Sequence, residues 1–228
     1  MEKNKPLKLS SNRIDGWFWQ FILVAVVHLF AVQFEAEAIA IVSKSVLIPA
    51  LGAWYWQHSQ RQYLWFYLAL AASWVGDILL TQSGVYYFIG GLLAFLLTHL
   101  IYAYFFFRSR AALKHWQVNL ILTLWCFLIV YGWYLTPFLA ELRLPVYFYM
   151  AVITTMASFA IARQRKLGGS RQVWQGALLF MLSDSVLAYG KFIHPLPGQH
   201  WWVMISYIAA QFYITWGMLR DESTIQEG

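Results

Sequence analysis

Residues 85–107 read VYYFIGGLLAFLLTHLIYAYFFF, a run that contains no Asp, Glu, Lys or Arg. An α-helix rises about 1.5 Å per residue, so a run of this length crosses the roughly 30 Å hydrocarbon core of a bilayer. The rest of the chain has the same character, since 61% of its 228 residues are hydrophobic and 11% are charged. Soluble domains are about 25% charged. The composition therefore excludes a water-soluble globule and predicts an all-α integral membrane protein.

Comparable apolar blocks recur along the whole chain and predict eight transmembrane helices. Trp and Tyr gather at the ends of the blocks, where such rings anchor helices at the headgroup level. The connections are short, so we expect a single transmembrane domain at 17–219, preceded by a basic cytoplasmic segment at 1–16 and followed by a cytoplasmic tail at 220–228. The blocks lie at 17–34, 39–56, 62–82, 85–107, 116–136, 145–162, 173–191 and 201–219.

The distribution of basic residues predicts the orientation. With the N-terminus in the cytoplasm, thirteen basic residues fall on the inner side and only Arg143 and Lys191 on the outer side. The positive-inside rule then places both termini in the cytoplasm, as for a protein of the bacterial inner membrane. The same distribution accounts for the excess of basic residues, so nucleic-acid binding is not needed to explain it. A rival interpretation is a signal peptide cleaved after Ala36-Glu37-Ala38, although its apolar stretch is longer than the usual 7–15 residues.

Two aspartates lie inside predicted spans, at similar depths in the outer half of the membrane. The segment around Asp77, SWVGDILL, resembles the segment around Asp184, LFMLSDSVL. This similarity indicates two parallel four-helix units related by an axis along the membrane normal. A carboxylate at the centre of a span costs about 2.5–3.5 kcal/mol. Two explanations are open: the aspartates bond helices together, or they form a functional site.

Other polar residues fall within or beside the same spans. Lys44 and Lys191 are each close enough to the outer surface to extend their ammonium groups to it. Alternatively, they neutralise the aspartates or a lipid phosphate. His99 lies nearer the middle of its span and shares a helix face with Tyr102, and Gln211 is similarly placed. Each is either a satisfied polar residue of the interior or part of a site, and a site built from these residues would open outward.

Several chemistries lack the residues that they need. The sequence contains no G-x-S-x-G, H-E-x-x-H, G-x-x-x-x-G-K-[ST] or G-x-G-x-x-G motif, so hydrolysis by a serine elbow and ATP-driven transport have no support. The single cysteine, Cys126, excludes an intramolecular disulfide and a Cys-based metal cluster. The spacing of the His and Asp residues has no metal signature, and we expect neither a metal nor a cofactor.

Several segments together resemble the YhhN-like family of integral membrane lysoplasmalogenases. The resemblance implies eight helices, a catalytic pair formed by Asp77 and Asp184, and a site lined by Lys44, His99, Tyr102 and Gln211. It also implies hydrolysis of the vinyl ether bond of lysoplasmalogens. The sequence departs from the family's Lys-Pro-Leu segment, because Ser45 follows Lys44. The segments are Ser43–Pro49 (SKSVLIP), Gly76–Leu80 (GDILL), Gly91–Tyr102 (GLLAFLLTHLIY), Gly176–Ser185 (GALLFMLSDS) and Ala210–Gln211.

The chemistry of enol ethers agrees with two carboxyl groups. Such ethers hydrolyse once the carbon β to oxygen is protonated, which creates an oxocarbenium ion that water captures. A carboxyl group in an apolar setting retains a proton, and a second carboxylate stabilises the cation, as in glycosidases. The sequence does not tell which aspartate is the acid. Lys191, at the outer end of its span, is a further residue expected to bind the substrate.

Two other classes of function stay open. The aspartates could relay protons in a small proton-coupled transporter of lipids or solutes. Such proteins often interrupt matched helices with Gly or Pro, whereas Pro49 and Gly90-Gly91 have no counterpart in the second half. A non-catalytic scaffold would have little reason to keep two acids at one depth. The expected partners are a lysophospholipid substrate and membrane lipids, and the sequence is silent on oligomeric state.

Overall fold

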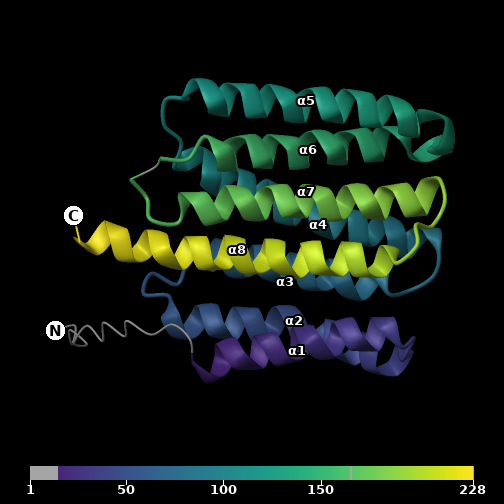
Figure 1. The fold of residues 1–228 in the computed structure, drawn as a ribbon, viewed down its shortest axis with the longest axis horizontal. Helices are drawn as coiled ribbons and strands as arrows, with labels where there is room; N and C mark the ends of the chain where they lie inside the picture. Colours follow the sequence, from purple (N-terminus) through teal and green to yellow (C-terminus); the bar gives the residue numbers. More distant parts are fainter. Residues whose placement is uncertain (1–14, 165, 228) are drawn as a thin grey trace.

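The computed structural model describes residues 15–164 and 166–227, with the side chains of 223–227 left aside. Eight α-helices run through this part of the chain, and each overlaps one predicted block (Figure 1). Two short 3₁₀ turns precede α6. The helices are α1 (Gly16–Gln33), α2 (Glu37–His58), α3 (Leu64–Leu80), α4 (Val85–Arg108), α5 (His115–Leu135), α6 (Arg143–Ile161), α7 (Ser170–Phe192) and α8 (Gln199–Glu227).

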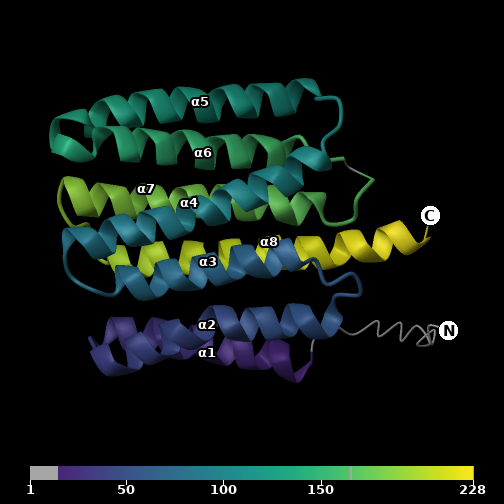
Figure 2. The same cartoon turned by 180° about the vertical axis from the view of Figure 1, so that it is seen from behind.

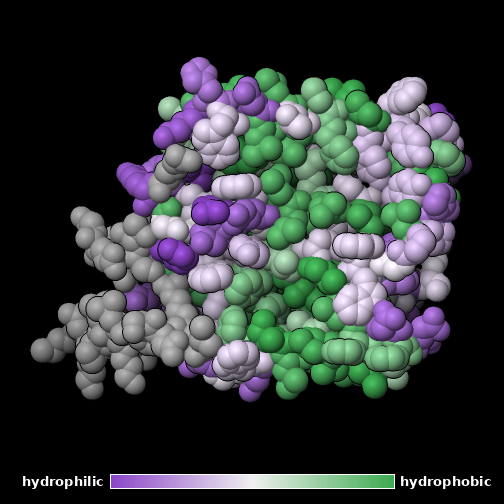
Figure 3. All heavy atoms as spheres, in the orientation of Figure 1, coloured by the Kyte–Doolittle hydropathy of each residue, from purple (hydrophilic) through white to green (hydrophobic). Residues whose placement is uncertain are grey.

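The helices have the length and surface of a membrane protein. Six of those described, α1, α2, α4, α5, α6 and α8, are long and apolar enough to cross a bilayer. Helix α3 is apolar but has only 17 residues. Helix α7 is more polar than α3, so neither helix is among the six. On the face shown in Figure 3, apolar groups occupy the middle of the molecule and hydrophilic groups gather towards both ends. The chain is therefore an all-α integral membrane protein.

Sequential helices pack as antiparallel pairs, α1 with α2, α3 with α4, α5 with α6 and α7 with α8. Contacts of α4 with α6, and of α8 with α1 and α2, join the pairs into one bundle. Helices α3 and α4 lie behind α7 and α8, and α5 lies at the margin (Figures 1 and 2). Among the described helices, α5 packs mainly on α6, so most of its surface faces outward.

Small residues let two helix pairs approach closely, as the sequence predicts for several glycines. A Cβ atom on Gly176 of α7 would lie 2.8 Å from the carbonyl oxygen of Ala210 on α8. A Cβ atom on Gly76 of α3 would lie 2.7 Å from the ring of Phe95 on α4. Larger side chains at these positions would force the helices apart and displace the two aspartates that α3 and α7 carry.

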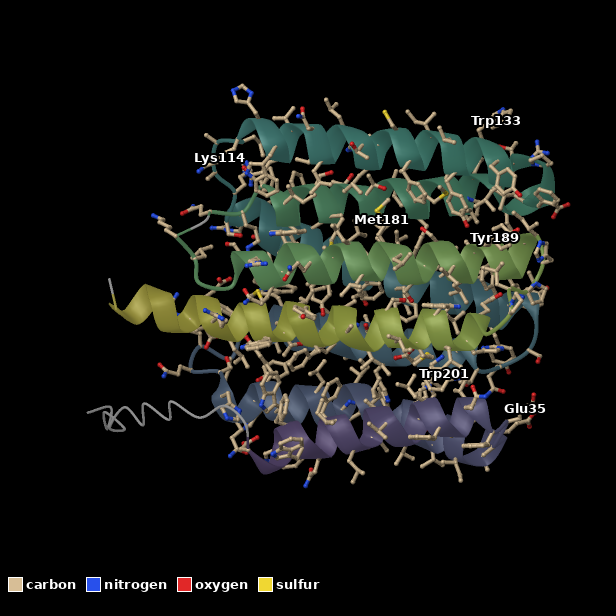
Figure 4. The ribbon with its side chains drawn as sticks, in the orientation of Figure 1. Glu35, Lys114, Trp133, Met181, Tyr189 and Trp201 are labelled. Atoms are coloured by element: carbon tan, nitrogen blue, oxygen red, sulfur yellow. The ribbon has the colours of Figure 1, made fainter. Side chains whose placement is uncertain are left out.

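We call the two ends of the bundle the basic end and the distal end. The basic end is where α1 begins and α8 ends, and it carries Arg61, Arg108, Arg110, Lys114, Arg163, Lys166, Arg171 and Arg220. At the distal end lie the loops around Glu35 and Gly84 and the 3₁₀ turns (Figure 4).

The predicted tail at 220–228 begins instead as a continuation of α8. Its first two acidic residues are buried and hold loops at the basic end. Asp221 pairs with Arg163 and accepts a hydrogen bond from the Gly169 N–H at 2.9 Å. Glu222 accepts hydrogen bonds from Tyr55, Ser59 and the backbone N–H of Gln60. These bonds explain why the helix does not stop at the predicted boundary. The predicted basic segment at 1–16 lies almost entirely outside the described residues.

Candidate functional site

Asp77 is buried near the distal end of α3 and has two partners from other helices. Its side chain is 4% exposed. The Lys44 ammonium on α2 lies 3.7 Å from Asp77 Oδ1, and the Tyr207 hydroxyl on α8 donates a hydrogen bond of 2.6 Å to Oδ2. Lys44 therefore serves as the counter-ion that the sequence allowed, rather than only extending to the surface.

A chain of hydrogen bonds continues from Tyr207 towards the middle of the bundle. The Gln211 amide lies 3.5 Å from the Tyr207 hydroxyl and donates to Ser73 Oγ at 2.5 Å. The Tyr102 hydroxyl donates to Gln211 Oε1 at 3.0 Å. Tyr102 and Gln211 are fully buried, so they support the Asp77 cluster from behind.

Asp184 on α7 belongs to a second cluster, formed with α4 and α6. His99 Nε2 lies 3.2 Å from Asp184 Oδ2 and 2.9 Å from the Tyr149 hydroxyl. The Tyr149 hydroxyl also donates to Oδ2. Both partners therefore act on one oxygen, and no hydrogen bond within the described part of the chain engages Oδ1.

Aromatic rings separate the two clusters. Phe180 lies with its ring centre 4.6 Å from the His99 ring and 5.4 Å from the Tyr207 ring. Phe95 contacts both Phe180 and Tyr207. The wall formed by Phe95 and Phe180 is apolar. In such a medium a charge is felt over a longer distance than in water.

Asp184 lines a cavity in the distal half of the bundle, and Asp77 is not among the residues that line it. The cavity has a volume of about 60 Å³, which is small beside the roughly 300–1,000 Å³ of sites that enclose a drug-sized ligand. Its walls are almost entirely apolar and come from α3, α4, α5, α6 and α7. The labelled Met181 and Tyr189 bracket the stretch of α7 that carries Asp184 (Figure 4). Lining residues include Leu80, Phe88, Leu92, Phe95, Phe127, Leu128, Tyr131, Tyr149, Met150, Met181 and Phe192.

Lys191 lies beside a residue of the cavity wall. It is exposed, and its ammonium group sits 4.9 Å from the centre of the Phe88 ring, which lines the cavity. Lys191 follows Asp184 by seven residues, so the two side chains share a face of α7 about 10 Å apart along the helix.

The predicted site residues thus fall into three places. Lys44, Tyr102 and Gln211 join the Asp77 cluster, His99 joins the Asp184 cluster, and Lys191 lies beside Phe88 of the cavity wall. Among the predicted residues, Asp184 alone lines the cavity.

The tyrosine partners of the aspartates, Tyr149 and Tyr207, were missed from the sequence. So was His28, a buried residue of α1 whose Nδ1 lies 3.0 Å from Ser43 Oγ, next to Lys44. His28 is an ionisable residue within a span, which is a signal that could have identified it.

Comparison with known proteins gives a family match over most of the chain. The model of the YhhN family matches residues 39–218. The human lysoplasmalogenase TMEM86B is 33% identical over 222 residues, covering 93% of this chain and 91% of that protein. The bovine lysoplasmalogenase TMEM86A is 28% identical over 166 residues, covering 71% and 68%. The porcine lysoplasmalogenase TMEM86B is 37% identical over 151 residues, covering 64% and 60%. No solved structure matches the chain.

Proposed function

The chain belongs to the YhhN family, and from that premise we propose that it is a lysoplasmalogenase. It hydrolyses the vinyl ether bond of an alkenyl glycerophosphoethanolamine or glycerophosphocholine to a fatty aldehyde and the glycerophospho base. The names of its relatives support this activity. The observation that carries the proposal is the carboxyl group of Asp184, placed in the wall of an apolar cavity.

Asp184 is the acid in this proposal. Tyr149 and His99 hold Oδ2, so the proton resides on Oδ1 and passes to the β carbon of the vinyl ether. The electron pair of the double bond forms the new C–H bond, and the cation is shared between the ether oxygen and its neighbouring carbon. Water then attacks that carbon and gives its proton to the Asp184 carboxylate, which restores the acid. The resulting hemiacetal collapses to aldehyde and alcohol.

Asp77 acts as the charged partner. The Lys44 ammonium and the Tyr207 hydroxyl both contact its carboxyl group. Since it does not line the cavity, it stabilises the oxocarbenium ion through the aromatic wall rather than by contact. A fixed charge directed at a developing charge is among the strongest contributions to catalysis. His99, Tyr102 and Gln211 then support the carboxyl groups rather than touching the lipid.

We also propose that all eight helices span the membrane, with the basic end in the cytoplasm. Helix α3 has 17 residues, at the lower limit for a span, and α7 turns Asp184 towards the interior. The excess of Lys and Arg at the basic end supports this orientation. The cavity then opens in the outer half of the membrane, with a bacterial inner membrane as the expected location.

The transporter alternative has less support. Transporters commonly place broken helices at their binding site. Helix α2 instead continues through Pro49 from Glu37 to His58 without interruption, and the described parts of α3 and α7 that carry the aspartates are also continuous. No observation on the described residues favours transport over hydrolysis.

Isotope labelling tests the proposed reaction. Purified protein in detergent should release a long-chain aldehyde from an alkenyl lysolipid, while the saturated alkyl ether should be inert. In heavy water, one solvent deuterium should appear on the carbon next to the aldehyde carbonyl, because that carbon receives the proton. In ¹⁸O-labelled water, the glycerophospho product should contain no label. Label in the glycerol would indicate displacement at the glycerol carbon and would overturn this mechanism, even with both aspartates essential.

Lys191 is expected to bind the phosphate of the substrate. In a lysoplasmalogen the vinyl ether and the phosphate sit at opposite ends of the glycerol, and Asp184 and Lys191 are spaced to take one each. An exposed ion pair contributes up to about 1 kcal/mol, so Lys191→Met should raise KM about fivefold. The value of kcat should stay unchanged, since the contact persists through the reaction. Arg143→Met, which removes another exposed cation at the distal end, is the matched control. Equal effects of both variants on KM would contradict a specific role.

A further inference from the structure

The cavity is too shallow to hold a fatty chain below the reacting bond. Asp184 lies eight residues before the distal end of α7, and Met181, three residues deeper, is the deepest residue of α7 that lines the cavity. Three residues correspond to about 4.5 Å of helix. On α6, Ile153 and Thr154 close the cavity one helical turn below Tyr149. The hydrocarbon chain of a lysolipid therefore needs another way out.

Helices α4 and α5 together form one side of the cavity. Helix α4 crosses the back of the bundle obliquely, packing on α6 and on α3, while α5 packs on α6 (Figure 2). Between the described α4 and α5 no extensive contact forms. Leu92 of α4 and Phe127 and Leu128 of α5 nevertheless line the same cavity. On this side the cavity wall therefore comes from two helices that do not pack extensively on each other, which leaves room for an opening between them.

The opening is at the depth of the acid. Phe127 lies eight residues before the end of α5, as Asp184 does before the end of α7. The Phe127 side chain is 42% exposed. Nearer the distal end, the Tyr131 hydroxyl donates a hydrogen bond of 2.6 Å to the Ser185 carbonyl oxygen. This bond ties α5 to α7 on the distal side of Phe127 and Leu128.

We propose that Leu92, Phe127 and Leu128 form a lateral portal through which the alkenyl chain of the bound substrate extends into the bilayer. The inference rests on the proposed function, because it assigns a chain to the cavity. The part of the substrate held by the protein is then the glycerophosphate, the vinyl ether and the first few methylene groups. The remaining chain stays in lipid, which is as apolar as the cavity wall, so no additional binding energy depends on its length.

The portal can be tested by measuring the turnover of substrates that differ in chain length or in the bulk of their terminal group. Alkenyl lysolipids of increasing length are compared in mixed micelles at a fixed surface fraction. The value of kcat/KM should stay within about threefold, whereas a closed pocket would lose roughly tenfold or more per misfitting methylene. A substrate with a pyrene group on its terminal carbon should also react. A sharp length limit or rejection of the pyrene substrate would overturn the portal while leaving hydrolysis itself intact.

Substitutions at the portal give a second measurement. Leu92→Trp and Leu128→Trp narrow it from either side and should raise KM for long chains more than for chains too short to reach it. Val130→Trp is the control, because Val130 is on the outer face of α5 and 64% exposed. Either portal variant suffices if the other does not fold. Equal changes for long and short chains would contradict the portal.

A binding experiment separates the portal from catalysis. A saturated ether lysolipid with a terminal pyrene cannot react, so it reports binding even if the protein hydrolyses nothing. In nanodiscs that contain brominated lipid, bromine atoms should quench the pyrene fluorescence of the bound probe as strongly as that of probe dissolved in the bilayer. A bound probe shielded from the bromine atoms would place the chain end inside the protein and overturn the proposal.

Discussion

Replacing Asp184 by Asn is expected to lower turnover of an alkenyl lysolipid by about 10³-fold, the typical contribution of a positioned general acid. The Asn side chain has nearly the same shape, and its carbonyl oxygen can still accept the bonds from Tyr149 and His99. It has no carboxyl proton to deliver to carbon. The measurement is the rate of aldehyde release per folded molecule in detergent, with the thermal unfolding temperature recorded on the same sample.

The control for this variant is Glu141→Gln, which makes the same carboxylate-to-amide change on an exposed residue at the distal end. It should leave both rate and unfolding temperature unchanged. If Asp184 only bonds helices together, Asp184→Asn would lower the unfolding temperature and leave the rate per folded molecule nearly intact. That result would remove Asp184 from the chemistry and would leave the cavity without an acid.

The helices could be predicted from the sequence because the bilayer imposes one simple requirement on each of them. A span needs about twenty apolar residues, and seven of the eight predicted blocks end within three residues of the helices in the structure. The exception is the last block. Asp221 and Glu222 have the composition of a solvated tail, yet partners on distant loops keep them buried within α8. Pairing between loops far apart in the sequence leaves no local pattern to read.

The charged members of the site could be predicted because they interrupt the apolar pattern of the spans. A charge inside an apolar block is conspicuous, and this feature identified Asp77, Asp184 and Lys44. Tyr149 and Tyr207 carry the hydrogen bonds to these carboxyl groups and remained hidden. The chain has 14 tyrosines, and tyrosine is enriched at membrane interfaces, where it anchors helices. Their role depends on which helices face each other, which hydropathy does not determine.

The sequence also could not show which aspartate meets the cavity. Both lie in the distal half of the bundle, but the cavity follows from the oblique path of α4 beside α7, on the Asp184 side of Phe180. Asp77 lies on the other side, with Lys44 and Tyr207. The two acids of an apparent repeat therefore have unequal surroundings, and unequal roles follow from them.

The second large effect is expected at the Asp77–Lys44 pair, which lies outside the cavity. Asp77→Asn should lower both stability and turnover, because it leaves the Lys44 ammonium without its partner at 3.7 Å. Breaking a buried ion pair costs at most about 3–5 kcal/mol. The loss should be smaller here, since the Lys44 side chain is 16% exposed and can extend towards the interface. The single variant alone cannot separate a structural role from an electrostatic one.

Combining Asp77→Asn with Lys44→Met separates the two roles. The double variant buries no unpaired charge, so its unfolding temperature should return close to that of the unaltered protein, as when a buried ion pair is replaced by apolar groups. The rate should nevertheless stay about 10²-fold low, the usual loss when one stabilising group for a transition-state charge is removed. The proposed role of Asp77 needs its carboxylate, and the uncharged Asn and Met side chains do not supply one. Recovery of rate together with stability would show that Asp77 only holds helices together, and hydrolysis would then depend on Asp184 alone.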